Sequence, residues 1–236
     1  MGNKLLVLNH KMNLVNKDLA MYLKYLETVN GANLVVCPSA LYLPYFVKHG
    51  YSAGIQNLYI ETKGSFTGEI SAVQAVSLGV KYAIIGHSER RQLFHETNNL
   101  VSEKLAAAKE AGLTSILCIG EAKHSLRSKT IILNQLKKSL NNMHDINNII
   151  IAYEPIWAIG TNKTPTNKQI EHVVSHIKAY ILKKYNREVK VLYGGSVNEK
   201  NIKHLNQMSS IDGYLVGNAS LNVQKVDEIL RVILQR

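Results

Sequence analysis

The chain has 236 residues, 46% of them hydrophobic, and a formal net charge of +11 at pH 7. This length suits one α/β domain with a large core, and no apolar stretch approaches the roughly 20 residues of a membrane span. The lysines are scattered and are not interleaved with aromatic residues, so the charge favours attraction of a phosphorylated metabolite over nucleic-acid binding.

The first apolar run, Leu5–Leu8, is too short for the core of a signal peptide, which predicts a cytoplasmic protein. Short runs rich in Val, Ile and Leu then alternate with stretches of helical periodicity. The predicted strands are Leu5–Asn9, Leu34–Cys37, Ala53–Gln56, Tyr82–Gly86, Ser115–Ile119, Ile149–Tyr153, Val189–Tyr193 and Gly213–Val216. The predicted helices lie around residues 17–29, 40–49, 70–78, 97–111, 126–141, 167–185, 198–206 and 223–235.

Near-continuous hydrophobicity in these strands indicates burial on both faces, as in a parallel sheet. Strand–helix pairs without a compositional break predict a single domain over residues 1–236, a closed (β/α)8 barrel of the α/β class. A doubly wound open sheet is the alternative, but no GxGxxG motif follows the first strand. Cys37 and Cys118 lie in apolar runs without metal-ligand spacing, which predicts reduced buried thiols and no metal site.

Polar and glycine residues follow the carboxyl ends of six predicted strands, the face where such barrels carry their chemistry. They are Asn9 and Lys11, Gln56 and Asn57, Gly86 to Glu89, Glu154, Gly194 to Ser196, and Gly217 with Asn218. Because solubility alone does not explain polar groups gathered on one face, we expect a site there.

The most informative segment is Ala152–Thr161, in which a strand delivers a single carboxylate, Glu154, to its end. Pro155 stiffens the exit, and an apolar stretch with the only tryptophan, Trp157, follows. A carboxylate that takes a proton from carbon needs a fixed position shielded from water, and a hinged apolar flap would provide the shield. The alternative is an ordinary strand, turn and helix start with Trp157 in the core.

Seven segments occurring in this order resemble the triosephosphate isomerase family over nearly the whole chain. They are Asn9–Asn13, Gly64–Glu69, Ile85–Arg91, Cys118–Glu121, Ala152–Thr161, Tyr193–Val197 and Asp212–Gly217. Each alone is weak, but together they are specific. The resemblance implies a TIM barrel that interconverts dihydroxyacetone phosphate and D-glyceraldehyde 3-phosphate through an enediol, in glycolysis and gluconeogenesis, without a metal or an organic cofactor.

The resemblance also implies a role for each catalytic residue. Glu154 matches the general base, and His87 matches the neutral electrophile at the substrate carbonyl, a state that a helix starting near Ser88 would favour. Lys11 matches a fixed cation near the phosphate, with Asn9 orienting it and touching substrate oxygens. Glu89 matches a carboxylate that pairs with Lys11, although pairing with one of the following arginines is an alternative.

Backbone N–H groups bind oxyanions well at loops and short helix starts, and the resemblance places Gly160, Ser196, Gly217 and Asn218 at the substrate phosphate. Thr67, in the protruding segment Gly64–Glu69, matches a residue that reaches the active site of a second subunit. The resemblance therefore implies a homodimer, whereas a plain surface loop is the alternative.

Four features depart from the family pattern. His10 replaces a tryptophan, His95 stands where glycine is usual, and Asn218 replaces the second of two glycines. The segment 121–130 is also short. Asparagine tolerates positive φ, so the backbone path at Asn218 is expected to be kept, with added bulk beside the phosphate.

Two other functions are compatible with parts of the sequence. Another phosphate-binding barrel enzyme would keep the phosphate loops but would not need Asn9, Lys11, His87 and Glu154 together. A catalytically silent basic protein that binds nucleic acid or a protein partner would need none of them.

Overall fold

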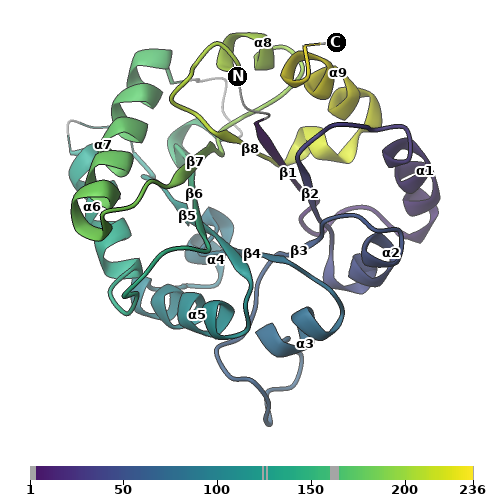
Figure 1. Ribbon diagram of the computed structural model, residues 1–236, viewed down its shortest axis with the longest axis horizontal. Coiled ribbons are helices and arrows are strands. Elements are labelled where there is room, and N and C mark those ends of the chain that lie inside the picture. Colours follow the sequence, from purple (N-terminus) through teal and green to yellow (C-terminus); the bar gives the residue numbers. More distant parts are fainter. Residues whose placement is uncertain (1–3, 124, 126, 160–164, 236) are drawn as a thin grey trace.

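The computed structural model describes residues 4–123, 125, 127–159 and 165–235. Its strands form an inner ring, and its helices form an outer ring around it (Figure 1). The strands are β1 (Leu5–Asn9), β2 (Leu34–Cys37), β3 (Gly54–Ile55), β4 (Tyr82–Ile85), β5 (Thr114–Ile119), β6 (Ile149–Tyr153), β7 (Lys190–Tyr193) and β8 (Gly213–Val216).

All described strand pairs are parallel, in the order β2-β1-β8-β7-β6-β5-β4-β3. The two ends of this order meet at a parallel bridge between Val36 and Ala53, where the Val36 N–H donates to the Ser52 carbonyl at 2.9 Å. The sheet therefore closes on itself, which confirms the (β/α)8 barrel and excludes the open doubly wound sheet.

Helices follow most strands and pack outside them. The α-helices are α1 (Asn16–Leu26), α2 (Leu43–Lys48), α3 (Ala72–Ser77), α4 (Ser88–Leu93), α5 (Asn98–Glu110), α6 (Ser128–Ser139), α7 (Asn167–Tyr185), α8 (Ile202–Leu205) and α9 (Val223–Ile233). The described residues also form the short 3₁₀ helices η1 (Ala40–Tyr42), η2 (Ile156–Ala158) and η3 (Asn218–Leu221). Side-chain oxygens cap the N-termini of several helices. The Thr166 side chain, for example, accepts the Gln169 N–H at the start of α7.

The core has two parts that follow from the alternation of strand side chains. Leu5 and Val7 point into the barrel with residues such as Ile116 and Leu215. Leu6 and Leu8 belong instead to the larger cluster that includes residues of the surrounding helices. β1, β6 and β8 are buried along their whole length, which confirms the predicted burial of the strands on both faces.

Cys37 and Cys118 are buried free thiols in the inner part, as predicted. Within the described part of the chain, no helix has the length and apolar character needed to span a bilayer. The segment between β3 and α3 projects outward from the barrel as a long loop (Figure 1). It contains Gly64–Glu69, every residue of which is exposed.

Candidate active site

A cavity of about 820 Å³ opens at the carboxyl ends of the strands. Eight of the predicted site residues line it, namely Asn9, Lys11, His87, Glu89, Glu154, Ser196, Gly217 and Asn218. Gly160 lies outside the described residues, and Thr67 is exposed on the projecting loop and does not line the cavity. The barrel therefore brings together residues from five strand ends that are far apart in the sequence.

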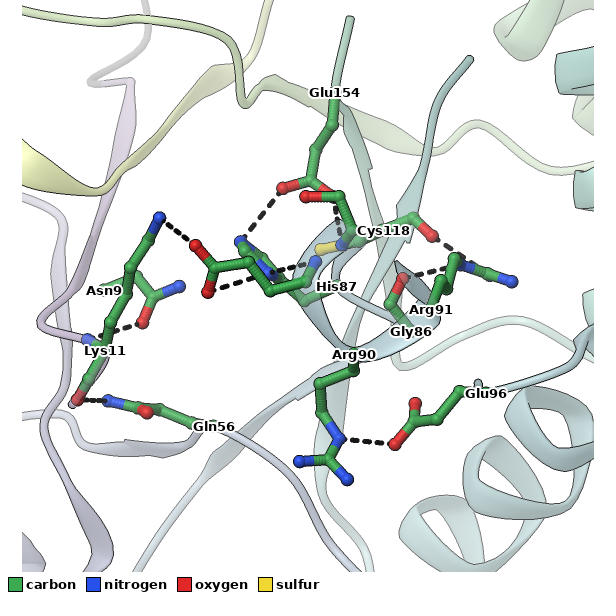
Figure 2. A network of polar contacts seen from close by, with 12 residues as sticks. Asn9, Lys11, Gln56, Gly86, His87, Arg90, Arg91, Glu96, Cys118 and Glu154 are labelled. Atoms are coloured by element: carbon green, nitrogen blue, oxygen red, sulfur yellow. Dashed lines mark hydrogen bonds and ion pairs between the residues drawn. The ribbon is translucent and has the colours of Figure 1, made fainter. Parts of the chain in front are cut away.

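Glu154 and His87 face each other at the centre of the site (Figure 2). The His87 Nε2 atom lies 3.1 Å from Glu154 Oε1. The other carboxylate oxygen, Oε2, accepts a hydrogen bond from the Ser88 backbone N–H at 3.0 Å. Glu154 is 2% exposed, so the carboxylate is held by donors from one loop and is shielded from water.

The tautomer of His87 follows from its position at the start of α4. His87 is the N-cap residue of this helix, and its Nδ1 accepts the Glu89 backbone N–H at 3.3 Å. A neutral imidazole that accepts at Nδ1 carries its proton on Nε2. His87 therefore directs an N–H toward Glu154 and the cavity, and the helix predicted to start near Ser88 is present.

Two glycines make room for Glu154. A Cβ on Gly120 would lie 1.7 Å from the Glu154 carbonyl oxygen, and a Cβ on Gly194 would lie 3.1 Å from Glu154 Cγ. The backbones after β5 and β7 therefore approach the end of β6 closely. Side chains at either position would displace the carboxylate.

Cys118, on β5, is a neighbour of the Glu154 carboxylate that we did not predict as part of the site. Burial raises the pKa of the Cys118 thiol, and the charge of Glu154 raises it further. The thiol therefore stays protonated and can donate to the carboxylate. Its burial was foreseeable, but its contact with Glu154 depends on the register Cys118 opposite Ala152.

Lys11 has a left-handed backbone, with φ of 53°. Its N–H donates to Asn9 Oδ1 at 3.0 Å, and its carbonyl accepts from Gln56 Nε2 at 2.9 Å. Figure 2 shows the contact of Gln56 with Lys11, and Gln56 also donates to the Cys37 carbonyl at 2.9 Å. Asn9 and Gln56 therefore hold a backbone conformation that costs a non-glycine residue free energy.

The Lys11 ammonium lies 2.5 Å from Glu89 Oε1. The alternative partners of Glu89 are engaged elsewhere: Arg90 pairs with Glu96, and Arg91 donates to the carbonyls of Gly86 and Cys118 (Figure 2). Of the two pairings considered for Glu89, the structure therefore contains the one with Lys11.

The Lys11 stem crosses the loop after β8. A Cβ on Gly217 would lie 3.1 Å from Lys11 Cε, so the absence of a side chain there lets the lysine pass. Ser196 Oγ, on the loop after β7, donates to the Ala158 carbonyl of η2 at 3.3 Å. The three loops that the resemblance assigns to phosphate binding or the flap therefore lie around one end of the cavity.

The first part of the flap is anchored to the end of β5. Trp157 Nε1 donates to Glu121 Oε1 at 2.8 Å, and the Tyr153 hydroxyl donates to the same oxygen at 3.2 Å. Trp157 is therefore not a simple core residue, because its indole N–H ties η2 to a buried carboxylate. Glu121 belongs to the segment Cys118–Glu121, but its position in the sequence does not reveal this contact.

The structure accommodates the departures in different ways. His95 has φ of 54°, the left-handed conformation that favours glycine. Asn218 begins η3 and is not among the residues with positive φ, so the tolerance of asparagine for positive φ is not used at this position. His10 is 1% exposed and packs edge-on against Tyr22, with ring centroids 4.6 Å apart.

In the portion of the chain that the structure describes, no group of three or more His, Cys, Asp or Glu residues is placed to hold a metal ion. The cavity instead offers a buried carboxylate, an imidazole N–H, an ammonium group and the glycine-bearing loops. This set can move a proton on a small anionic carbonyl compound.

Comparison with known proteins agrees with this chemistry. The sequence model of the triosephosphate isomerase family matches residues 4–233. A triosephosphate isomerase of Mycoplasma mobile is 39% identical, over 98% of this chain and 100% of the relative. One of Neurospora crassa is 40% identical, over 94% of this chain and 95% of the relative. One of Thermoanaerobacter pseudethanolicus is 45% identical over 71% of each chain. The chain therefore belongs to the triosephosphate isomerase family and is an isomerase.

Proposed function

We propose that the chain interconverts dihydroxyacetone phosphate and D-glyceraldehyde 3-phosphate, with Glu154 as the base and His87 as the electrophile. The observation that supports this assignment is the 3.1 Å approach of His87 Nε2 to Glu154 Oε1 inside the cavity. A general base and a hydrogen-bond donor side by side are what proton transfer next to a carbonyl requires.

In the proposed reaction, the Glu154 carboxylate removes a proton from the carbon that bears the hydroxyl group. The electron pair moves onto the neighbouring carbonyl oxygen, which gives an enediolate, and the hydroxyl proton passes to that oxygen. Glu154 then returns its proton to the adjacent carbon, and the oxygen that lost its proton becomes the new carbonyl. Glu154 and His87 both line the cavity, so a substrate bound there lies within reach of the carboxylate and of the imidazole.

His87 stabilises the charge that develops on the carbonyl oxygen. Its Nε2–H is available because Nδ1 accepts a backbone N–H, so the ring donates as a neutral imidazole. A neutral donor also avoids a short ion pair with Glu154 that would compete with the substrate.

Lys11 supplies positive charge near the phosphate and the developing enediolate, and Asn9 and Gln56 fix its position. We assign the phosphate to the loops that carry Ser196, Gly217 and Asn218, together with Gly160 of the flap. Sealing the cavity protects the enediol, which otherwise loses its phosphate by elimination, and lowers the local dielectric constant.

A coupled assay of glyceraldehyde 3-phosphate isomerisation tests this function. We expect clear turnover for the natural chain, and for Glu154→Asp a loss of roughly 10²-fold or more in kcat, because the base is retracted by one methylene. Glu171→Asp, at an exposed position of α7, is the matched control and should keep full activity. Turnover at background level in the natural chain would refute the proposal.

We also propose a cytoplasmic homodimer in which Thr67 reaches the active site of the partner subunit. Supporting it, Phe66 is 40% exposed on the projecting loop and Met12, beside Lys11, is 95% exposed. A cavity of about 210 Å³ opens between Lys11–Met12 and Gly68–Ile70. Apolar side chains exposed beside an active site favour burial in an interface. The two buried thiols suit a reducing compartment.

A further inference from the structure

Lys225, on the first turn of α9, lines the active-site cavity although the proposed proton transfer does not use it. Asn218 and Asn222, which precede it in the sequence, line the same cavity. Asn222 Oδ1 accepts the Lys225 backbone N–H at 3.0 Å, which fixes the start of the helix. The lysine is therefore presented to the cavity from a capped element beside the loop that we assign to the phosphate.

The charges along the cavity show why this lysine matters. Among the described lining residues, the acidic side chains are Glu89 and Glu154, and the lysine and arginine side chains are Lys11 and Lys225. Without Lys225 the formal charge of this lining would be negative, since two carboxylates would face one ammonium group. A dianionic phosphate would then enter a lining that repels it, despite the positive charge of the whole chain.

The two lysines differ in how closely each ammonium group is paired with a carboxylate. Lys11 Nζ lies 2.5 Å from Glu89 Oε1, whereas Lys225 Nζ lies 3.4 Å from Glu199 Oε1. Charge-assisted hydrogen bonds are about 2.7–2.9 Å long, so the contact of Lys225 with Glu199 is longer than such a bond. The Lys225 side chain is 46% exposed, and Glu199 does not line the cavity. Lys225 can therefore act on an arriving anion.

We infer that Lys225 is a second cationic group for the phosphate end of the substrate, which draws the dianion into the cavity, whereas Lys11 serves both the phosphate and the reacting end. This inference rests on the proposed function for the identity of the ligand. The attraction acts before the chemical step, so it should raise kcat/KM and leave kcat unchanged. Removing one unit charge near a dianion is expected to change kcat/KM by about three- to tenfold at low ionic strength.

The test compares Lys225→Gln with Lys137→Gln, which removes the same charge from an exposed position of α6 outside the cavity. We expect kcat/KM to fall about three- to tenfold in Lys225→Gln at low ionic strength, with kcat kept. The deficit should shrink at about 0.3 M salt, where charges are screened within several Å. Lys225→Arg should restore the natural value. Equal kcat/KM and equal salt dependence in the two Gln variants would overturn the inference.

Inorganic phosphate provides a readout that needs no turnover. Its dissociation constant, measured by calorimetry, should rise in Lys225→Gln and stay at the natural value in Lys137→Gln. Unchanged phosphate binding in Lys225→Gln would contradict the inference while leaving the isomerase function intact. Absence of isomerase turnover in the natural chain would instead refute the proposed function. The phosphate dissociation constants would then still test whether Lys225 contributes to phosphate binding.

Discussion

Gln56 donates a hydrogen bond from Nε2 to the carbonyl of Lys11 at 2.9 Å, across 45 residues of sequence. The contact joins the end of β3 to the loop after β1, and the second hydrogen bond of the same amide holds the Cys37 carbonyl of β2. Gln56 therefore links three neighbouring strand ends and supports the left-handed backbone of Lys11.

Replacing Gln56 with Met keeps the length of the side chain and removes both donors. We expect kcat/KM to fall by roughly 10–100-fold, because a displacement of about 1 Å in a site of this kind can cost 10²-fold. Gln224→Met, on the exposed surface of α9, is the matched control. Steady-state kinetics measure the difference between the two variants. Equal activity of the two would contradict this role for Gln56.

His10 makes stability depend on pH. Both ring nitrogens are buried without a hydrogen-bond partner among the described residues, and burial lowers the pKa of His10 from 6.5 to about 3. As pH falls below about 6.5 the unfolded chain binds a proton that the folded chain does not accept until about pH 3. The free energy of unfolding therefore decreases as the pH is lowered through this window.

His10→Phe removes the titrating group and keeps a ring against Tyr22 and Phe46. Between pH 8 and pH 5, the natural chain should lose about 2 kcal/mol more unfolding free energy than the variant. Urea titrations at one protein concentration measure this difference. His204→Gln, an exposed histidine of α8, should behave like the natural chain. Parallel pH profiles for the natural chain and His10→Phe would show that His10 does not titrate as described.

His95 should be a site of local strain, since it is exposed and has φ of 54°. The left-handed conformation costs a non-glycine residue about 1–2 kcal/mol, and glycine loses about 0.5–1 kcal/mol more backbone entropy on folding. His95→Gly should therefore stabilise the fold by about 0.5–1 kcal/mol. His95→Ala keeps the strain and should give no gain, so thermal unfolding of the pair tests the assignment. Equal Tm values for the Gly and Ala variants would contradict it.

The projecting loop should hold the proposed dimer together. Sedimentation at micromolar concentration is expected to give twice the 26.4 kDa of the chain. Phe66→Asp should give single chains with much reduced turnover, because a buried unpaired charge is costly at an interface. Leu182→Asp, at an exposed apolar position of α7, should remain dimeric. A fully active single chain would refute the dependence on the partner.

The helix and strand boundaries show where local pattern suffices and where it does not. β1, β2, β6, β8 and α7 have the predicted bounds. The helix predicted over 198–206 is only Ile202–Leu205, because Asn198 Oδ1 accepts the N–H groups of Lys200 and Asn201 and forms a turn. Side-chain hydrogen bonds of this kind compete with helix formation, and hydrophobic periodicity does not reveal them.

The sequence by itself determined the barrel, because eight apolar runs alternating with amphipathic segments have few other ways to bury both sheet faces. It also placed the polar residues at one end, since their position after each strand is local information. The tertiary structure alone decided which groups meet. Lys11 pairs with Glu89 across 78 residues, Gln56 supports Lys11, and Cys118 lies beside Glu154. These contacts depend on strand register and loop path, which bring distant residues together and leave no periodic signal in the chain.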